Sequence, residues 1–444
     1  MSLAVCADVG STYTKVAVVD LDGGVLVAGA SAPTTVGTDV LHGLHAAVAA
    51  ATDGLGVSDV PWYVCSSAGG GLRLAVVGFE PLVTAQAGRR VGLSAGANVV
   101  HVAAGRLGGA DLTALRAARP DVVLLVGGTD GGDADTLRHN ATRLARARWR
   151  VPTVLAGNVE VRDEVRALLA SAGVPVTVAD NVLPRIGVLA PVSARAAIRE
   201  VFLRHVIGGK KLSRGGRFAR LVRAATPDAV LTGVEVLADA VGGDLVVLDV
   251  GGATTDVYSV LTPDERDSGP GREVAGTLWR ARTVEGDLGM RWSAPGVVRA
   301  AAEERLLAVG EQDVLAPEAA VRAADPGFLP GDDAGRAVDA RIAGLAATVA
   351  LRRHARGAAT GERAGRDLRD VRLVVGSGGV LRHAPSADAA GVLAGVLADH
   401  AGGWPVPRAA RAVVDVDYVL AAGGLLAAEH PGAARALLCR HLEA

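Results

Sequence analysis

The sequence contains few cysteines and few aromatic residues. Its three cysteines, Cys6, Cys65 and Cys439, lie far apart, with no CxxC motif and no histidine nearby at a metal-ligand spacing. This argues against a cysteine-based metal site and favours a reduced cellular compartment. Aromatic residues make up only 3% of a chain that is 50% hydrophobic, so we expect a core of closely packed Ala, Val and Leu.

Long apolar runs and an excess of charge are also missing. No run approaches the roughly 18 uncharged apolar residues that indicate a membrane span, and no basic targeting segment precedes the first strand pattern. Lys and Arg total 46 against 47 Asp and Glu, which disfavours a polyanion-binding face. We therefore expect a cytoplasmic protein with neither a membrane nor a nucleic acid as partner. Lysine occurs only at Lys15, Lys210 and Lys211.

Two stretches repeat the pattern of strand, Asp, glycine-containing turn and strand. They read LAVCADVGSTYTKVAVVD from Leu3 and LVVLDVGGATTDVYSV from Leu245. In such a turn backbone N–H groups converge on an anion, and the carboxylate that ends the first strand can hold a hydrated divalent cation. The metal candidates are Asp8 and Asp249. The predicted phosphate contacts are Gly10, Ser11, Thr12, Thr14, Lys15, Gly251, Gly252 and Thr254. For the first turn alone, an ordinary polar hairpin is an equal alternative.

Other glycine-rich segments are ambiguous. The run DVVLLVGGTDGGD, residues 121–133, is either a loop that binds an anion at a helix N-terminus or a flexible turn in which Asp caps the helix. Residues 66–71 allow the same two interpretations. The GGKK run at 208–211 lacks P-loop spacing and favours a solvated turn. The EGDLGM run at 285–290 is either an acidic loop lining a cleft or a turn with a helix cap.

The remaining pattern predicts an α/β protein of two to four domains. Between 61 and 182, short apolar strands alternate with helices, as in a parallel layer. We expect strands at 3–9, 15–20, 25–30, 62–65, 74–78, 98–102, 121–126, 153–155, 174–178, 278–284, 371–375 and 412–415. We expect helices at 39–51, 192–206, 228–240, 295–357 with a break at 326–335, from 386, and at 419–429.

The order of five elements resembles the actin, heat-shock-chaperone and sugar-kinase ATPase superfamily. These are the two turns, the helix at 228–240, the VGSGG run at 375–379 and the small-residue helix at 419–429. The resemblance implies two ribonuclease-H-like lobes that close on ATP and Mg²⁺, with Gly376, Gly378 and Gly379 in the adenosine loop. The predicted segments are 1–60 and 183–243 for the first lobe, 61–182 for an inserted α/β domain, and 244–444 for the second lobe.

Several segments look more specifically like the MutL (GlmL) family associated with glutamate mutase. They are CSSAGGGLRLAVVGFEP, LLVGGTDGGD, LAGN, LDVGGATTDVYSV and TVEGDLGM. The family implies an ATP-dependent accessory protein, a reactivase or chaperone, for an adenosylcobalamin-dependent mutase.

One position departs from the superfamily pattern. Chaperones place Glu before Pro at the start of the first connecting helix, whereas this chain has Thr226 before Pro227. A carboxylate must orient the attacking water, and Asp228, Glu235 or Asp256 are the candidates. We therefore expect slow hydrolysis at most. A small-molecule kinase and a non-hydrolysing nucleotide-binding scaffold stay as alternatives, and the mutase, the choice of ATP over GTP and a homo-oligomer stay open.

Overall fold

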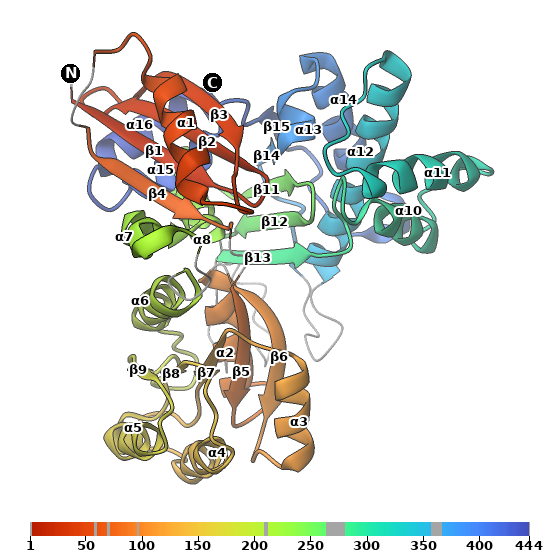
Figure 1. Ribbon diagram of the computed structural model, residues 1–444. Coiled ribbons are helices and arrows are strands. Elements are labelled where there is room, and N and C mark those ends of the chain that lie inside the picture. Colours follow the sequence, from red (N-terminus) through yellow and green to blue (C-terminus); the bar gives the residue numbers. More distant parts are fainter. Residues whose placement is uncertain are drawn as a thin grey trace. The chain divides into compact units, whose positions relative to one another are not determined.

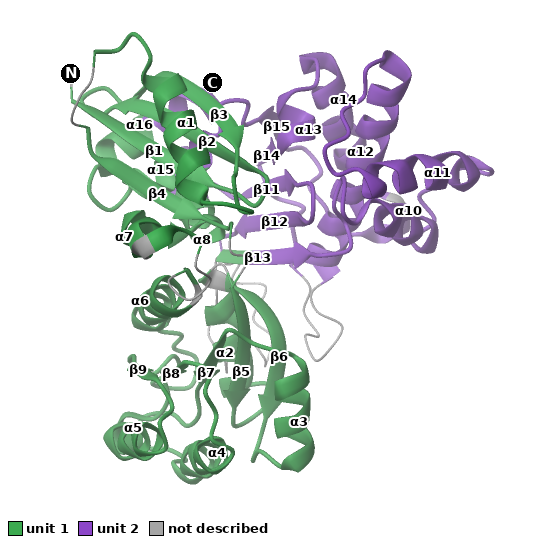
Figure 2. Cartoon of the chain, viewed as in Figure 1, with its two compact units in different colours: residues 1–233, 263–281, 421–436 green, residues 234–262, 282–420, 437–444 purple. Residues whose placement is uncertain are grey.

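The chain divides into two compact units. The computed structural model describes residues 2–56, 60–68, 72–95, 97–207, 212–262, 280–356 and 366–443 (Figure 1). Unit 1 comprises Met1–Gly233, Pro263–Ala281 and Ala421–Ala436, and unit 2 comprises Val234–Thr262, Arg282–Leu420 and Leu437–Ala444 (Figure 2). The boundary therefore falls inside three helices, α8 (Thr226–Val241), α15 (Val419–Leu426) and α16 (Pro431–Leu442), and inside strand β13 (Arg280–Glu285).

The first sheet of unit 1 has the strand order β10-β4-β1-β2-β3. Its strands are β1 (Leu3–Val9), β2 (Tyr13–Asp20), β3 (Val25–Pro33), β4 (Trp62–Ser66) and β10 (Val222–Ala225). The first three are antiparallel neighbours, whereas β4 runs parallel to β1 and to β10. Alternate apolar residues of β1 and β2 bury one face against α1 (Val40–Thr52), whose N-terminus Asp39 caps through the N–H of Leu41.

A second, fully parallel sheet lies between β4 and β10 in the chain, with the order β6-β5-β7-β8-β9. Its strands are β5 (Arg73–Gly78), β6 (Asn98–Ala104), β7 (Val122–Leu125), β8 (Thr153–Leu155) and β9 (Val176–Val178), and its helices are α2 (Thr84–Ser94), α3 (Gly109–Ala117), α4 (Asp135–Arg146), α5 (Arg162–Ser171) and α6 (Pro191–Val201). Alternate residues of β5 and β7 join two different core clusters. Both faces are thus buried, which explains the continuous apolar runs.

Helices of unit 1 complete the return to β10. After α6 the chain continues as a π-helix (Phe202–Ile207), and α7 (Arg217–Leu221) leads into β10. Phe202 and Phe218, among the few aromatic residues, are fully buried there and fill the space that the small core residues leave.

Unit 2 contains a sheet with the order β13-β12-β11-β14-β15, which repeats the strand order of the first sheet. Its strands are β11 (Leu245–Val250), β12 (Thr255–Val260), β13 (Arg280–Glu285), β14 (Leu373–Ser377) and β15 (Arg411–Val414), and its helices are α10 (Ala294–Glu303), α11 (Glu311–Ala324), α12 (Asp333–Arg356), α13 (Gly379–Arg382) and α14 (Ser386–Leu397). As in unit 1, the first two strands of the sheet are antiparallel, and the fourth runs parallel to the first. The core consists mainly of Ala, Val and Leu, as the composition predicts.

This duplicated order confirms the predicted fold class: two ribonuclease-H-like sheets of the actin-like fold, with a parallel α/β insert after the fourth strand of the first. One strand differs from our expectation. We grouped residues 62–65 with the insert, but β4 pairs with β1, because a short apolar strand looks the same from its sequence in either sheet. The domain boundaries that we predicted stay predictions.

Candidate functional site

The first turn connects β1 to β2 through Gly10, Ser11 and Thr12. The N–H of Gly10 donates to the carbonyl oxygen of Tyr13 at 3.1 Å, and a Cβ at Gly10 would lie 2.7 Å from that oxygen, so only glycine fits. Ser11 and Thr12 are exposed. Within the described residues, their backbone N–H groups and hydroxyls have no protein partner, which suits an anion.

Asp8 lies beside this turn with three donors around its carboxylate. The hydroxyl of Thr226 donates to Oδ1 at 2.5 Å, the thiol of Cys65 lies 3.6 Å from the same oxygen, and Nζ of Lys15 is 3.7 Å from Oδ2. Burial, and then the charge of Asp8, raise the pKa of the Cys65 thiol well above its usual value. Cys65 therefore stays protonated and can donate.

Thr14 lies on the other face of the first sheet. Asp8 and Lys15 are direct cross-strand partners and share one face, whereas the neighbouring Thr14 points the opposite way. Thr14 is fully buried, and its hydroxyl is 2.9 Å from that of Thr34. If Thr14 contributes to a phosphate site, it does so through its backbone.

The second turn, between β11 and β12, has the same construction. The N–H of Gly251 donates to the carbonyl oxygen of Thr254 at 2.9 Å, and a Cβ at Gly251 would lie 2.8 Å from that oxygen. The N–H groups of Gly252, Ala253 and Thr254 have no acceptor in the part of the chain that the structure describes. Asp249 is the second-last residue of β11, as Asp8 is of β1.

The end of the EGDLGM segment and the residues just after it form hydrogen bonds with the carbonyl groups of the second turn. The N–H groups of Met290 and Arg291 donate to the carbonyls of Gly251 and Gly252 at 2.9 and 2.8 Å, and the hydroxyl of Ser293 donates to the carbonyl of Ala253 at 3.0 Å. The carbonyls of the turn are thus occupied, which leaves its N–H groups pointing elsewhere. Glu285 and Asp287, the acidic residues of the segment, both pair with Arg353.

Asp256 faces Asp249 across the strand pair but is neutralised on its other side. It is a direct register partner of Asp249, and Arg282 donates to its Oδ1 at 3.1 Å. Burial raises the pKa of Asp256, and the charge of Arg282 opposes that rise. A carboxylate already bonded to a buried guanidinium is poorly placed to activate water.

The third glycine-rich run lies next to the second turn. Asp249 is the parallel register partner of Ser377, and a Cβ at Gly378 would lie 2.2 Å from the carbonyl oxygen of Val250. Gly376 packs against leucine side chains, whereas Gly379 faces open space at the start of α13. Unit 2 therefore brings together the predicted residues Asp249, Gly251, Gly252, Thr254, Asp256, Gly376, Gly378 and Gly379. Unit 1 brings together Asp8, Gly10, Ser11, Thr12 and Lys15.

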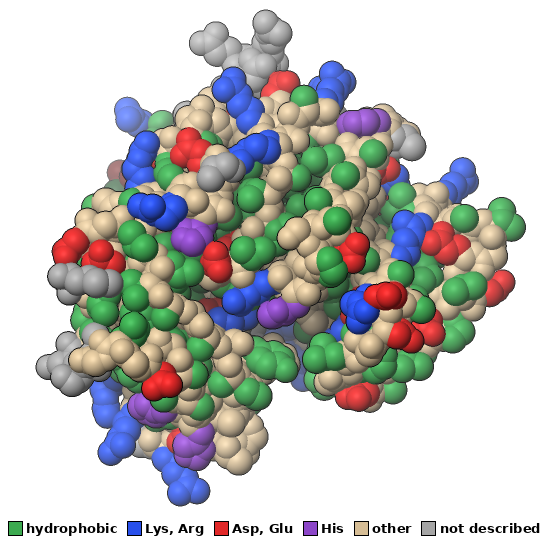
Figure 3. All heavy atoms as spheres, turned by 90° about the horizontal axis from the view of Figure 1, so that it is seen from above, with side chains coloured by type: hydrophobic (Ala, Val, Ile, Leu, Met, Phe, Trp, Pro, Cys, Tyr) green, Lys and Arg blue, Asp and Glu red, His purple; other side chains and the backbone are tan. Residues whose placement is uncertain are grey.

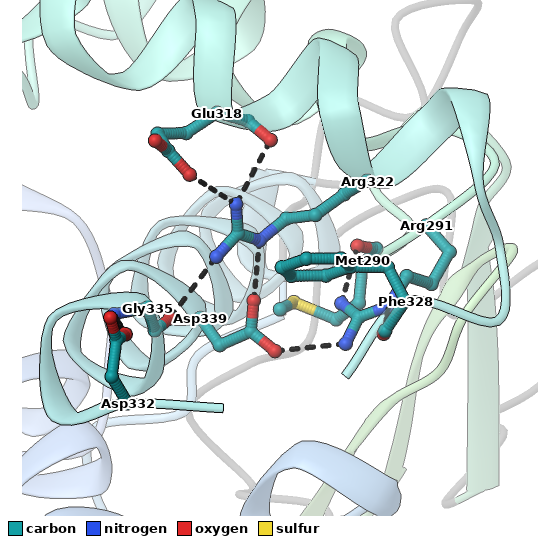
Figure 4. A network of polar contacts seen from close by, with 8 residues as sticks. All are labelled: Met290, Arg291, Glu318, Arg322, Phe328, Asp332, Gly335 and Asp339. Carbon is teal, nitrogen blue, oxygen red and sulfur yellow. Dashed lines mark hydrogen bonds and ion pairs between the residues drawn. The ribbon is translucent and has the colours of Figure 1, made fainter. Parts of the chain in front are cut away.

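A buried ionic network supports the second turn through Arg291 (Figure 4). Nη2 of Arg291 donates to Asp339 Oδ2 at 2.8 Å, and Nε of Arg322 donates to Oδ1 of the same carboxylate at 2.5 Å. The guanidinium of Arg322 also donates to Glu318 and to the carbonyl of Gly335. The side chain of Arg322 is 0% exposed, so these partners replace all of its hydration.

Sequence reasoning missed the partners that hold the predicted carboxylates. Thr226 and Cys65 at Asp8, and Arg282 at Asp256, come from segments distant in the chain. The family pattern marked the position of Thr226 but not its contact with Asp8, and no local motif marks Cys65 or Arg282. Of the other candidates for orienting water, Asp228 is buried and paired with Arg199 at 2.5 Å and Arg195 at 3.7 Å. Glu235 has a partner as well.

The remaining glycine-rich segments have local roles or lie outside the described residues. In the 121–133 run, Asp133 accepts from the N–H of Thr136, and Asp130 accepts from Val159 and from Asn181. The run thus behaves as a capped turn that its own side chains hold. Residues 69–71 and 208–211 are not described.

On the face in Figure 3, acidic and basic side chains are interspersed among hydrophobic ones. Among the helices that the structure describes, none has the length and apolar content needed to span a membrane. No group of three or more His, Cys, Asp or Glu side chains in the described ranges could hold a metal ion by itself. A cation near Asp8 or Asp249 would thus need ligands such as water and phosphate, as Mg²⁺ commonly has.

Comparisons with known proteins extend over nearly the whole chain. A family model described as MutL protein matches residues 4–442. The Protein MutL of Clostridium tetanomorphum is 34% identical over 457 aligned positions, which cover 98% of each chain. Among solved structures, nucleotide-free acetone carboxylase gives a TM-score of 0.43 at 17% identity, covering 96% of this chain and 70% of that one. A ROK hexokinase from Thermus thermophilus gives 0.27 at 15% identity, covering 98% and 97%.

Proposed function

Because the chain belongs to the MutL family associated with glutamate mutase, we propose that it is an ATP-binding accessory protein for an adenosylcobalamin-dependent mutase such as glutamate mutase. The observation that carries nucleotide binding is the repeated turn. Gly10 and Gly251 close two turns in the same way, each beside a strand-ending aspartate, and each turn leaves backbone N–H groups without a protein acceptor in the described chain.

Each turn would supply a different set of phosphate donors. Ser11 and Thr12 offer N–H groups and hydroxyls, and Gly252 and Thr254 offer N–H groups, while Gly376, Gly378 and Gly379 would lie along the adenosine. Asp8 and Asp249 would hold Mg²⁺ through water. When bound, the cation would neutralise charge on the β- and γ-phosphates.

Lys15 would change partner when nucleotide binds. It now pairs with Asp8 at 3.7 Å, where it balances the charge of a carboxylate that is 11% exposed. A cation near Asp8 would repel the ammonium group, and a phosphate at Ser11 and Thr12 would attract it. The ion pair thus keeps the turn neutral before the ligand arrives.

Hydrolysis would be slow because the candidate carboxylates among the described residues are already paired. Thr226 occupies the position of the chaperone glutamate, and its hydroxyl is engaged with Asp8. Asp228 and Asp256 are both paired with arginine. We propose that binding and slow turnover of ATP drive a conformational change that alters affinity for the mutase, as a reactivase or chaperone requires. The same threonine favours the second candidate, a scaffold that binds nucleotide without hydrolysing it.

Phosphate release and nucleotide binding test this function. We expect calorimetric Mg·ATP binding by the wild-type chain, and phosphate release that a cobalamin-dependent mutase stimulates. Asp249→Ala should abolish Mg-dependent binding, whereas Asp388→Ala, which removes an exposed carboxylate in the first turn of α14, should not. Binding that Asp249→Ala leaves unchanged would refute the phosphate-turn assignment. Binding without hydrolysis would select the scaffold, and ADP formation that depends on a small-molecule acceptor would select a kinase.

A further inference from the structure

Four arginines gather around a hollow at the amino-terminal edge of the inserted sheet. The hollow has a volume of about 230 Å³. It lies where α3 and α4 end and where the chain enters β7 and β8, elements labelled in Figure 1. Its lining residues, which we call the basic hollow, are Arg116, Arg119, Pro120, Ala147, Arg148, Trp149, Arg150 and Val151.

The charge of the basic hollow is not balanced by the protein. None of its lining residues is acidic, and within the described chain none of its four guanidinium groups forms an ion pair. Elsewhere in the described residues arginine is commonly paired, as in Arg138 with Glu164 or Arg352 with Asp399. Four cations placed together without a carboxylate repel one another, and an anion would relieve that repulsion.

Capping of helix ends accounts for only part of this cluster. Arg116 donates to the carbonyl of Ala147 at 3.1 Å, and Arg150 donates to that of Gly173 at 3.3 Å, as basic residues do at helix C-termini. The side chains of Arg119 and Arg148 have no such partner among the described residues. These two guanidinium groups are therefore available to a ligand.

The backbone at the same two arginines is left-handed. Arg119 has a φ of 43° and Arg148 a φ of 49°, at positions just after a helix where glycine is normally favoured. Arginine here carries an energetic cost that glycine would avoid.

Trp149 also lines the hollow. Its side chain is buried, with the residue only 5% exposed, and its Nε1–H has no hydrogen-bond acceptor in the ranges that the structure describes.

We propose that the basic hollow binds a small oxyanion, that is, a ligand carrying phosphate or carboxylate groups. Arg119 and Arg148 would pair with its oxygens. The volume is below the range of about 300–1,000 Å³ typical of larger ligands, so the ligand, or the part that enters, is small. This site lies in the insert and does not depend on the proposed nucleotide function.

Calorimetric titration of the full-length chain tests the proposal. Pyrophosphate and citrate serve as the phosphate and the carboxylate probe, at low and at high salt. We expect one of them to bind at low salt and to weaken as salt screens the exposed arginines. Arg119→Gln/Arg148→Gln should reduce affinity about tenfold or more, since charge-assisted hydrogen bonds are lost. Arg146→Gln/Arg217→Gln removes two exposed charges outside the hollow and should leave affinity unchanged.

Two further variants separate binding from folding. Arg119→Gly/Arg148→Gly should lose binding while its melting temperature stays equal or rises, because glycine adopts the left-handed backbone without strain. Trp149→Phe should remove any fluorescence change that the probe causes. Mg·ATP binding should be unaffected in all of these variants. Absence of binding by the wild-type chain at millimolar probe, or undiminished affinity in Arg119→Gln/Arg148→Gln, would overturn the proposal.

Discussion

Replacing Asp339 by asparagine should destabilise unit 2 strongly, because this carboxylate is the shared counter-ion of two arginines. Its oxygens accept from Arg322 at 2.5 Å and from Arg291 at 2.8 Å, and the three side chains are 9%, 0% and 12% exposed. In the amide, one oxygen becomes an NH2 group that faces a guanidinium, so donor meets donor. The substitution also removes the negative charge while keeping the side-chain volume.

The expected magnitude follows from the burial of this network. Removing one partner of a buried ion pair costs about 3–5 kcal/mol, since the remaining charge stays buried and uncompensated. For Asp339→Asn we expect a loss of about 3 kcal/mol in the free energy of unfolding, at the low end of this range, because Glu318 still pairs with Arg322. For a folding unit of roughly 150–250 residues this lowers the melting temperature by about 6–12 °C.

Thermal unfolding followed by circular dichroism measures this effect against a matched control. Asp333→Ala removes a carboxylate from the first turn of the same helix, α12, where its side chain is 98% exposed beside Arg336. That change should cost at most about 1 kcal/mol. If Asp339→Asn melts within about 2 °C of the wild type, the network does not contribute the stability that we assign to it. Because Arg291 also donates to Gly252, weaker ATP binding should accompany the loss of stability.

Three further predictions concern close packing and buried charge. Gly251→Ala should distort the second turn and abolish ATP binding, because its Cβ would lie 2.8 Å from a carbonyl oxygen; normal binding by this variant would contradict the geometry. Gly424→Ala should lower the melting temperature by at least several degrees, since its Cβ would lie 1.8 Å from a backbone oxygen of α8. Gly395→Ala, with open space around it, is the control for both and should stabilise α14 by about 0.5–1 kcal/mol. Burial raises the pKa of Asp415 to about 6, so the wild type should lose up to about 3 kcal/mol as pH rises from about 4 to about 6; this pH-dependent loss should be absent in Asp415→Asn. Denaturant titrations across that pH range measure it, and equal slopes in both proteins would show that Asp415 is not responsible.

The two turns were predictable because their information is local. An aspartate that ends a strand, followed two residues later by a glycine, specifies the turn, and the close approach of the Gly10 and Gly251 Cβ positions to a carbonyl explains the glycine. Strand order follows from the family resemblance rather than from periodicity. Periodicity alone placed residues 62–65 in the wrong sheet, since only pairing with β1 distinguishes the two.

Long-range contacts limited the prediction of the site. Met290 and Arg291 support the second turn through hydrogen bonds to Gly251 and Gly252, which lie almost 40 residues earlier in the chain. Nothing in the EGDLGM run marks it as support for a turn. Thr226 and Asp8 lie more than 200 residues apart in the chain, and the sequence did not predict the hydrogen bond between them.

The position of the insert has a consequence for how such a chain can diversify. It leaves the first sheet after β4 and returns at β10, and these strands are adjacent, with Val222 opposite Val64. The two ends of the insert are thus only roughly 10 Å apart, from the spacing of neighbouring strands and the rise along them. Closing a longer loop between fixed ends costs only about 0.6 kcal/mol for each doubling of its length. A whole domain can therefore be exchanged at this connection, while β1 and β2 stay paired and the turn between them keeps its conformation.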